Sequence, residues 1–543
     1  MFFAKLYIAF MEITFMKKLL CILLILCLCG LNGCVEKKKA VISNDNYDNS
    51  IIYNIGKIPD SLFSLDNKTD SSILPALFQG LVKYDSNNNI EGALAEKYII
   101  SDDKLTYKFI IRSDAKWSDG SKITANDFVN FFKEYIKRNI DNNDNLDCIF
   151  GVKEYRTSKN SFSNVAINAV DENTFQIRLN YPCDYLLSML TLPEYTLRNI
   201  DTDLDKWKDN YKQIKYSGPY IIKSIDSKGN INLDKNNCYW HKDNVINSNL
   251  VFSTIDNDEA AFANLITGKI NVLRDPPINQ IGDLKSNDSI NFLKGNTIAA
   301  LAFNLNSKPG DSSNIYTLNN DFRSAVSLYL DRGIICSDIL KNKYDPSVDY
   351  LNYNDNASLN KAYFQKKSSS NKADELIEKI KLPKGHTFDL IYVDSIENKL
   401  LCDTVISQIN NDKLNLNIHA AACNEEEYKQ RITTGKYDMA LIEIHKDFDS
   451  PISLLKKWEK NSPFNSFGYN NEKFNNIMVK LNFEKNDNIK SQYIHDGEDI
   501  LMNELPFIPV GIKRNILCNK NNINGLFINK NENLIFEGAY ITK

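Results

Sequence analysis

A short apolar run near the N-terminus separates a predicted export signal from the part of the chain that can fold as a globular protein. Two lysines precede the apolar segment 19–31, and Gly33 and Cys34 follow it. A basic start, an apolar stretch and a small residue before a cleavage point are the three parts of a secretory signal. The run is shorter than the roughly 20 apolar residues of a membrane-spanning helix. We therefore predict a signal peptide over residues 1–33, with Met16 as the better start; an uncleaved membrane helix is the alternative.

The cysteine at the end of this segment predicts where the mature protein is located. The stretch Leu31-Asn32-Gly33-Cys34 resembles the lipobox of bacterial lipoproteins, in which the cysteine is diacylated and becomes the mature N-terminus. Two or more acyl chains, such as palmitate, anchor a protein stably, whereas one chain binds only marginally. The polar segment 34–50 is typical of a flexible tether of roughly 20 Å. We expect a protein that is lipid-anchored through Cys34 at the extracytoplasmic face of the cell membrane.

The composition of the remaining chain suits a globular protein without nucleic-acid partners. The 543 residues are 43% hydrophobic, and such a length predicts two or three domains. A formal net charge of -4, without a basic stripe, excludes the charge pattern of a nucleic-acid-binding protein. Beyond Cys34 the cysteines are odd in number and never spaced as C-x-x-C. We expect buried thiols, not a disulfide framework, and leave a single bridge open.

Hydrophobic periodicity predicts a mixture of strands and helices. Period-two alternation or short apolar runs predict strands, and apolar residues at helical spacing predict helices. The predicted strands span 107–111, 175–179, 388–393 and 414–418, and the predicted helices span 124–136, 373–380 and 401–409. Thr124 and Asp127 resemble a capping box with Asp in place of Glu. The alternation of helix and strand after residue 373 indicates an α/β lobe.

The sequence offers little support for an enzyme or a metal protein. It contains neither a Gly-x-Ser-x-Gly elbow nor a His-Glu-x-x-His helix. Its five histidines are isolated, so no pair has the spacing of metal ligands. The acidic run 425–427 is typical of a solvated face. We expect no catalytic residue, no metal and no cofactor.

Six groups of segments, spread over almost the whole chain, carry a family resemblance. They are Ser64–Asp66 with Leu77–Leu81; Gly92–Glu96 with Leu105–Arg112; Lys116–Gly120 with Thr124–Phe128; Ser217–Tyr220 with Lys235-Asn236 and Tyr239-Trp240; Phe303-Asn304 with Arg323, Ala325 and Asp331-Arg332; and Asp447–Pro451 with Leu505–Pro509. In content and order they resemble the family 5 extracytoplasmic solute-binding proteins, the oligopeptide and dipeptide receptors of ABC importers.

The resemblance implies an α/β, two-lobed periplasmic-binding-protein-like fold of class II. The first lobe would span residues 51–295, with an extra subdomain inserted at about 80–205. The second lobe would span residues 296–509, and residues 510–543 would return to the first. The resemblance also implies a monomer that closes on peptides by a hinge motion and delivers them to an ABC permease with its ATPase subunits.

The resemblance places a ligand site around Asp447, which would pair with the α-ammonium group of a peptide. Two extended segments would add the peptide as an extra strand, mainly through their backbone groups. The residues expected to contact the ligand are Asp447, Glu443, Ile444, His445, Thr297, Ile298 and Ala300. The expected segments are 297–301 and 443–447. Trp117, the turn at Asp119-Gly120 and the bend at Gly218-Pro219 are expected to be structural.

The sequence departs from the family pattern at three positions, and other ligands remain open. Ile444 stands where tryptophan is frequent, His445 where one relative has cysteine, and Gln79 where glutamate is usual. A receptor for a nickel chelate, haem or another small solute is the alternative within the fold. A receptor for a pheromone peptide and a surface adhesin without a transport role are the further alternatives.

Overall fold

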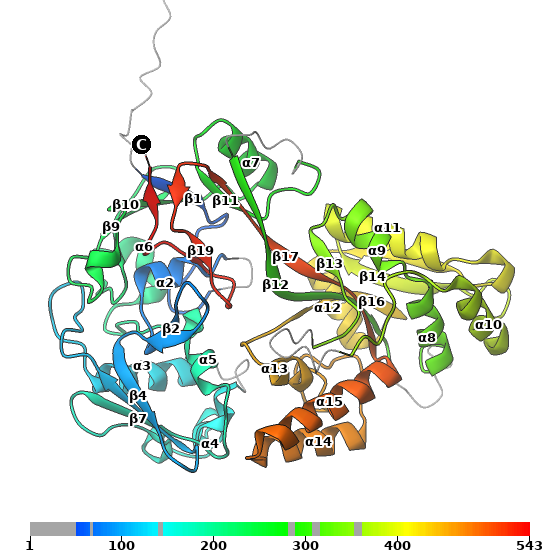
Figure 1. Cartoon of the computed structure of the whole chain (residues 1–543), viewed down its shortest axis with the longest axis horizontal. Coiled ribbons are helices and arrows are strands. Elements are labelled where there is room, and N and C mark those ends of the chain that lie inside the picture. The colour runs from blue at the N-terminus through cyan, green and yellow to red at the C-terminus, as the bar shows by residue number, and fades with distance from the viewer. Residues whose placement is uncertain are drawn as a thin grey trace, which may run out of the picture. The chain divides into compact units, whose positions relative to one another are not determined.

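The computed structural model describes residues 50–65, 69–138, 145–280, 288–306, 315–351 and 361–542. The predicted signal peptide, Cys34 and the tether up to residue 49 lie outside the described residues. Figure 1 shows two groups of elements that long strands connect.

Eleven of the described strands form one mixed sheet that reaches into both groups. Its order is β15 (Ile418–Cys423), β14 (Phe388–Val393), β16 (Met439–His445), β12 (Asp288–Phe303), β17 (Phe507–Lys520), β11 (Val272–Arg274), β1 (Ile51–Asn54), β10 (Asn249–Ser253), β9 (Ile231–Lys235) and β8 (Tyr220–Ile225), with β13 (Tyr344–Pro346) also paired to β17. β1 is parallel to β10 and β11, and β14 is parallel to β15 and β16, whereas the other pairs are antiparallel.

The connection between the two groups is the antiparallel pair of β12 and β17 (Figure 1). Its register runs from 288–294 opposite 514–520, breaks, and resumes at Thr297 opposite Lys513. The break contains Gly295, where an added methyl group would overlap with the carbonyl oxygen of Lys513. A bulge of this kind bends a strand and increases its twist locally.

The first hydrophobic core is built from residues 51–272 and from the C-terminal residues 517–539. It contains a four-stranded antiparallel sheet in the order β4 (Ala95–Ile100), β5 (Thr106–Ile111), β7 (Thr174–Arg178) and β6 (Ile167–Ala169). The helix α3 (Ala125–Arg138) packs on this sheet through Phe128 and Phe132, whose rings contact Phe175. The smaller pairs are β2 (Val82–Tyr84) with β3 (Ile90–Gly92), β18 (Ile523–Asn524) with β21 (Tyr540–Ile541), and β19 (Phe527–Ile528) with β20 (Leu534–Ile535).

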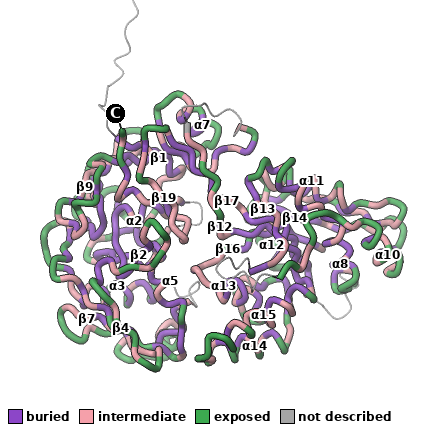
Figure 2. The backbone as a smooth tube through the Cα atoms, viewed as in Figure 1, coloured by how far each residue is buried: buried purple, intermediate pink, exposed green. Residues whose placement is uncertain are grey.

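Two further cores lie on the two faces of β12, β14 and β16. Neighbouring residues of a strand point to opposite faces, so Ala299 and Leu301 enter one core while Ile298 and Ala300 enter the other. The helices around them are α8 (Asn320–Tyr329), α10 (Ser370–Ile380), α11 (Ile396–Ile409), α12 (Glu425–Thr434), α13 (Pro451–Lys456), α14 (Glu472–Phe483) and α15 (Asp487–Glu504). Figure 2 shows buried positions concentrated where strands and helices meet.

Most of the predicted elements are present. The strands predicted at 107–111, 175–179 and 388–393 correspond to β5, β7 and β14, and the three predicted helices to α3, α10 and α11. Thr124 donates from its backbone N–H to Asp127 Oδ2 at 2.7 Å, which is the backward half of a capping box. Trp117 is buried, as expected of a structural residue.

The strand predicted at 414–418 is wrong in its bounds. Residues Asp412–Leu414 form a 3-10 turn, Asn415 has a φ of +56°, and β15 begins only at Ile418. A left-handed residue cannot continue an extended strand, and asparagine adopts that conformation more readily than most residues. Among the seven described cysteines all are free thiols, and all except Cys238 are buried.

Candidate functional site

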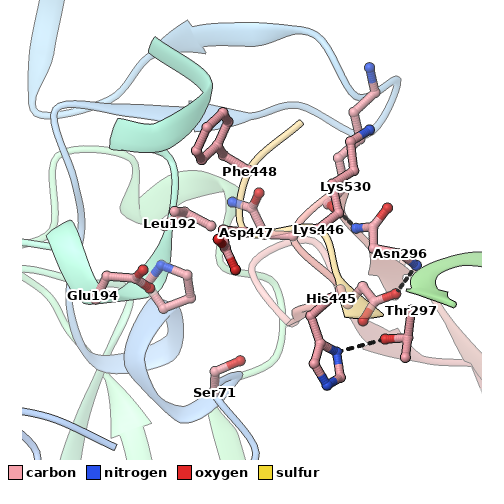
Figure 3. A pocket seen from close by; sticks show the side chains of 13 residues that line it. Ser71, Leu192, Glu194, Asn296, Thr297, His445, Lys446, Asp447, Phe448 and Lys530 are labelled. Atoms are coloured by element: carbon pink, nitrogen blue, oxygen red, sulfur yellow. Dashed lines mark hydrogen bonds between the residues drawn. The ribbon is translucent and has the colours of Figure 1, made fainter. Parts of the chain in front are cut away.

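A cavity of about 170 Å³ lies where five separate parts of the chain meet (Figure 3). It is lined by Ser71, Leu192, Pro193, Glu194, Asn296, Thr297, His445, Lys446, Asp447, Phe448, Lys530, Asn531 and Glu532. One water needs about 10–15 Å³ of such a volume, so the cavity has room for several waters or for a polar end group of a ligand.

The end of β16 and the loop after it contribute four of the thirteen lining residues. His445 is the last residue of β16 and lies opposite Thr297 of β12, whose Oγ1 is 2.9 Å from His445 Nδ1. The next residue, Lys446, donates its backbone N–H to the carbonyl of Asn296 at 3.1 Å. Asn296 lies in the bulge that interrupts the register between β12 and β17. β16 ends at His445, and residues 445–448 line the cavity.

Asp447 is fixed by the short helix that follows it. Its backbone N–H donates to Ser453 Oγ at 2.7 Å, and its carboxylate oxygens lie 2.5 and 2.7 Å from Lys457 Nζ. Ser453 is part of α13, and Lys457 comes directly after that helix. The carboxylate is 36% exposed, so it faces the cavity while the ammonium group neutralises it from behind.

Asp449 joins three elements beside the cavity. Its carboxylate lies 2.7 Å from Lys446 Nζ and 2.8 Å from Lys530 Nζ, and its backbone N–H donates to Ser188 Oγ at 3.0 Å. Burial alone would raise the pKa of Asp449, but the two ammonium groups outweigh it and lower the pKa. The loop after β16 is thereby tied both to the C-terminal segment and to α5 (Leu186–Leu190) of the first core.

Phe448 ties the same loop to the first core by packing. Its ring stacks on Tyr185, with centroids 4.4 Å apart and planes inclined by 14°, and it is 2% exposed. Lys456 Nζ donates to the hydroxyl of Tyr185 at 2.9 Å. Phe448 therefore belongs to the first hydrophobic core, although Ile444 and Leu454 belong to one of the cores beside β12, β14 and β16.

The structure brings together only some of the residues expected to bind a ligand. Asp447, His445 and Thr297 line the cavity. The side chains of Ile444, Ile298 and Ala300 are buried in the core instead. Glu443 lies outside the lining, with its carboxylate 3.4 Å from Lys513 Nζ and 3.7 Å from His445 Nε2.

One of the two segments expected to pair with a ligand strand has no free edge. Residues 297–301 are paired with β16 on one side and with β17 on the other, so the prediction of strand addition there is wrong. The segment 443–447 differs. β14 pairs with β16 only at Met439 and Ala440, and no other described strand pairs with that edge further along. Among the described residues no strand competes with a ligand for the backbone of residues 443–445 on this edge.

Sequence reasoning missed the lining that comes from outside β12 and the β16 loop. Ser71, the 3-10 turn Pro193–Tyr195 with Leu192, and the segment 530–532 carry no motif that marks them. Glu194 is the most notable of these residues, because Figure 3 shows its side chain extending toward Asp447. Burial raises the pKa of Glu194; a hydrogen bond from its own backbone N–H and the charge of Arg198 partly offset this rise, and the charge of Asp447 adds a smaller one.

Comparison with known families decides where this chain belongs. Residues 89–466 match the family model described as bacterial extracellular solute-binding proteins, family 5 Middle. The chain belongs to this family. A family 5 protein is an extracytoplasmic solute-binding protein of a transport system, and this confirms the recognition made from the sequence.

Individual relatives agree with the family assignment. The chain is similar to the dipeptide-binding protein DppE of Bacillus subtilis, with 24% identity over 472 residues, 83% of this chain and 84% of that protein. It is also similar in structure to an oligopeptide-binding protein of Borrelia burgdorferi, with a TM-score of 0.75, 21% identity and coverage of 91% and 100%. The Haemophilus influenzae OppA complex with RPPGFSPFR gives a TM-score of 0.71, 21% identity and coverage of 91% and 99%.

These likenesses confirm the predicted fold class, an α/β, two-lobed periplasmic-binding-protein-like fold. In the described part of this family 5 protein, no helix combines the length and the apolar character that a membrane crossing needs. The same residues hold no group of three or more histidine, cysteine or carboxylate side chains arranged to bind a metal ion.

Proposed function

We propose that this protein is a receptor that captures peptides by their amino terminus and passes them to an ABC importer. The observation that carries the proposal is the position of Asp447, a carboxylate that faces the cavity directly beyond the unpaired edge of β16. The relatives support it, since DppE is named for dipeptides and the Haemophilus protein holds a nine-residue peptide.

The chemistry follows from what all peptides share. A carboxylate and an ammonium group form a charge-assisted hydrogen bond, which is about twice as strong as a neutral one. Backbone pairing along residues 443–445 would hold the peptide without reading its side chains. Both interactions are indifferent to sequence, which suits a receptor for many peptides.

Closure of two lobes around the ligand is the proposed mechanism. The proposed lobes are residues 51–295 with 510–543, and residues 296–509, with the inserted subdomain at about 80–205. A ligand stabilises the closed form only by its differential affinity for that form. Thr297 and the loop 445–448 on one side and Leu192–Glu194 on the other would supply this difference, because they meet at the same cavity.

The proposed setting is a monomer anchored by lipid at Cys34, close to a permease and its ATPase subunits, without catalytic activity. We expect Cys34→Ser to release the protein into the medium with unchanged peptide affinity, because the anchor holds the body without contacting the ligand. Cell fractionation and calorimetry of the released protein check this. Retention of the variant in the membrane fraction would contradict the lipid anchor.

Mass spectrometry of the ligand that co-purifies with the protein tests the function directly. A mixture of peptides supports a nutritional receptor, and a single peptide indicates a signalling receptor. A metal chelate or haem would overturn the peptide proposal, and so would a failure to bind any peptide in calorimetry, the result expected of an adhesin.

Loss of the Asp447 carboxylate is expected to weaken peptide binding. We expect Asp447→Ala to cost about 2–5 kcal/mol, because the variant leaves the peptide ammonium without its partner in the closed cavity. Calorimetry with the co-purifying peptide measures the change. Asp403→Ala, at an exposed carboxylate of α11, is the matched control and should bind as the wild type does. Equal affinities of the two variants would contradict amine capture by Asp447.

A further inference from the structure

The carboxylates that line or adjoin the cavity differ in whether a described residue forms an ion pair with them. Asp447 is neutralised by Lys457, and Asp449 by Lys446 and Lys530. Glu532 lies 3.8 Å from an Arg274 nitrogen and accepts the backbone N–H of Asn296. The carboxylate of Glu194 differs from these, because no described residue forms an ion pair with it.

The neighbourhood of Glu194 explains this difference. Arg198 is almost fully buried and would be the natural partner, but its guanidinium donates to main-chain carbonyls. The acceptors are the carbonyls of Pro193 at 3.0 Å, Glu194 at 2.9 Å and Thr196 at 3.3 Å. Arg198 thus holds the backbone of the 3-10 turn rigidly and leaves the Glu194 carboxylate without a direct hydrogen bond from it. The side chain is then free to extend toward the cavity, as Figure 3 shows.

We propose that Glu194 is a second amine-recognising carboxylate, which holds the ammonium group of the ligand from the first lobe while Asp447 holds it from the second. The proposal rests on the proposed function. An ammonium group has three N–H donors and no acceptor, so it can bond to two carboxylates at once. Lys457 already neutralises Asp447, whereas the attraction of Arg198 offsets the burial of Glu194 only in part, so a cationic ligand gains most from Glu194.

This arrangement makes the amine a bridge between the lobes. In the unliganded protein burial raises the pKa of Glu194, the charge of Arg198 opposes this rise, and the repulsion from Asp447 adds to it. A cation between the two carboxylates offsets their repulsion. The same chemistry has two sources, the α-ammonium of a peptide and the ammonium of a lysine side chain, and the experiment separates them.

The test compares three probes by calorimetry at pH 7.5. They are an equimolar set of tri-, tetra- and penta-alanine, the same set with acetylated amino termini, and an acetylated set whose first residue is lysine. For the wild type we expect the free set to bind at least 100-fold more tightly than the acetylated one. For Glu194→Gln we expect this ratio to fall at least tenfold, with Glu96→Gln on the exposed face of β4 as the matched control.

The outcomes separate the two proposals. If the wild type binds none of the probes, the peptide function itself fails. If the wild type prefers free amines and Glu194→Gln keeps the full ratio, only the role of Glu194 fails. If the wild type binds the lysine set tightly but not the free set, Glu194 recognises a side chain of the ligand. This result would overturn the α-ammonium assignment.

A second readout distinguishes recognition from a structural role. An ionised carboxylate with a raised pKa lowers the stability of the folded state, so its removal should stabilise the unliganded protein. We expect Glu194→Gln to raise the melting temperature without ligand and to reduce the shift that the free set produces. A lower melting temperature without ligand would mean that Glu194 supports the fold and would overturn the proposal.

Discussion

At the scale of single residues, Gly295 is the described glycine at which an added methyl group would have the least room. A methyl group there would meet the carbonyl oxygen of Lys513 on the neighbouring strand. We expect Gly295→Ala to destabilise the protein by about 1–3 kcal/mol, because the backbone of β12 or β17 must move. Urea unfolding measures the change.

The matched control for this substitution is Gly497→Ala, in the interior of α15. A methyl group at Gly497 would lie 3.4 Å from Leu455 Cδ1, an ordinary contact. Alanine is favoured over glycine in a helix by about 1 kcal/mol, so this variant should be as stable as the wild type or more so. Destabilisation by both variants alike would contradict the steric argument at Gly295.

Lys457 sets the charge of the site from behind Asp447. Its ammonium group contacts both carboxylate oxygens and is 16% exposed. We expect Lys457→Met to lower the stability of the unliganded protein and to increase the stabilisation that a free-amine peptide produces, because Asp447 then lacks its internal cation. Thermal unfolding with and without peptide checks this. A smaller stabilisation by peptide than in the wild type would mean that Lys457 only positions Asp447.

At the scale of elements, Asp449 connects the loop after β16 to the C-terminal segment. Its two ammonium partners lower its pKa, so the folded state favours the ionised form. At neutral pH we expect Asp449→Asn to reduce the free energy of unfolding by about 1.5–3 kcal/mol, the range for hydrogen bonds to charged groups.

The pH dependence of this effect has a definite sign. A lowered carboxyl pKa stabilises the folded state above the unfolded-state pKa of about 3.9, and the contribution is lost as the pH falls through the lower folded-state pKa. The difference between wild type and Asp449→Asn should therefore be full at pH 7 and shrink below about pH 4. Urea unfolding at both pH values measures it; a difference that grows on acidification would contradict the assignment.

Elements with strong periodicity were predictable, and the site was predictable only in part. β5 and α3 follow from alternation and from the capping pattern at Thr124, both of which are local. Asp447 was found because it lies within a family motif. Glu194 and the segment 530–532 reach the cavity through long-range packing, and nothing in their local sequence signals it. Ile444 of β16 and Ala300 of β12 are buried because both point to a face of the sheet that a hydrophobic core covers.

At the scale of the whole molecule, paired strands join the first hydrophobic core to the two cores beside β12, β14 and β16. β12 and β17 stay hydrogen-bonded on both sides of the bulge at Gly295 and Asn296. The sequence resemblance predicted the two-lobed fold because its six groups of segments span nearly the entire chain. The structural relatives likewise cover 91% of the chain. The cavity lies beside the bulge, since Asn296 and Thr297 contribute to its lining.

The place of β17 in the sheet also has a consequence for the order of folding. This strand comes from residues 507–520, near the C-terminus, and pairs with the earlier strands β11, β12 and β13. The pairs β8–β9, β9–β10, β1–β10, β14–β15 and β12–β16 can form without it, whereas β11 and β12 each keep an unpaired edge until residues 507–520 have been synthesised. The two parts of the large sheet are therefore joined only by a strand that emerges near the end of translation.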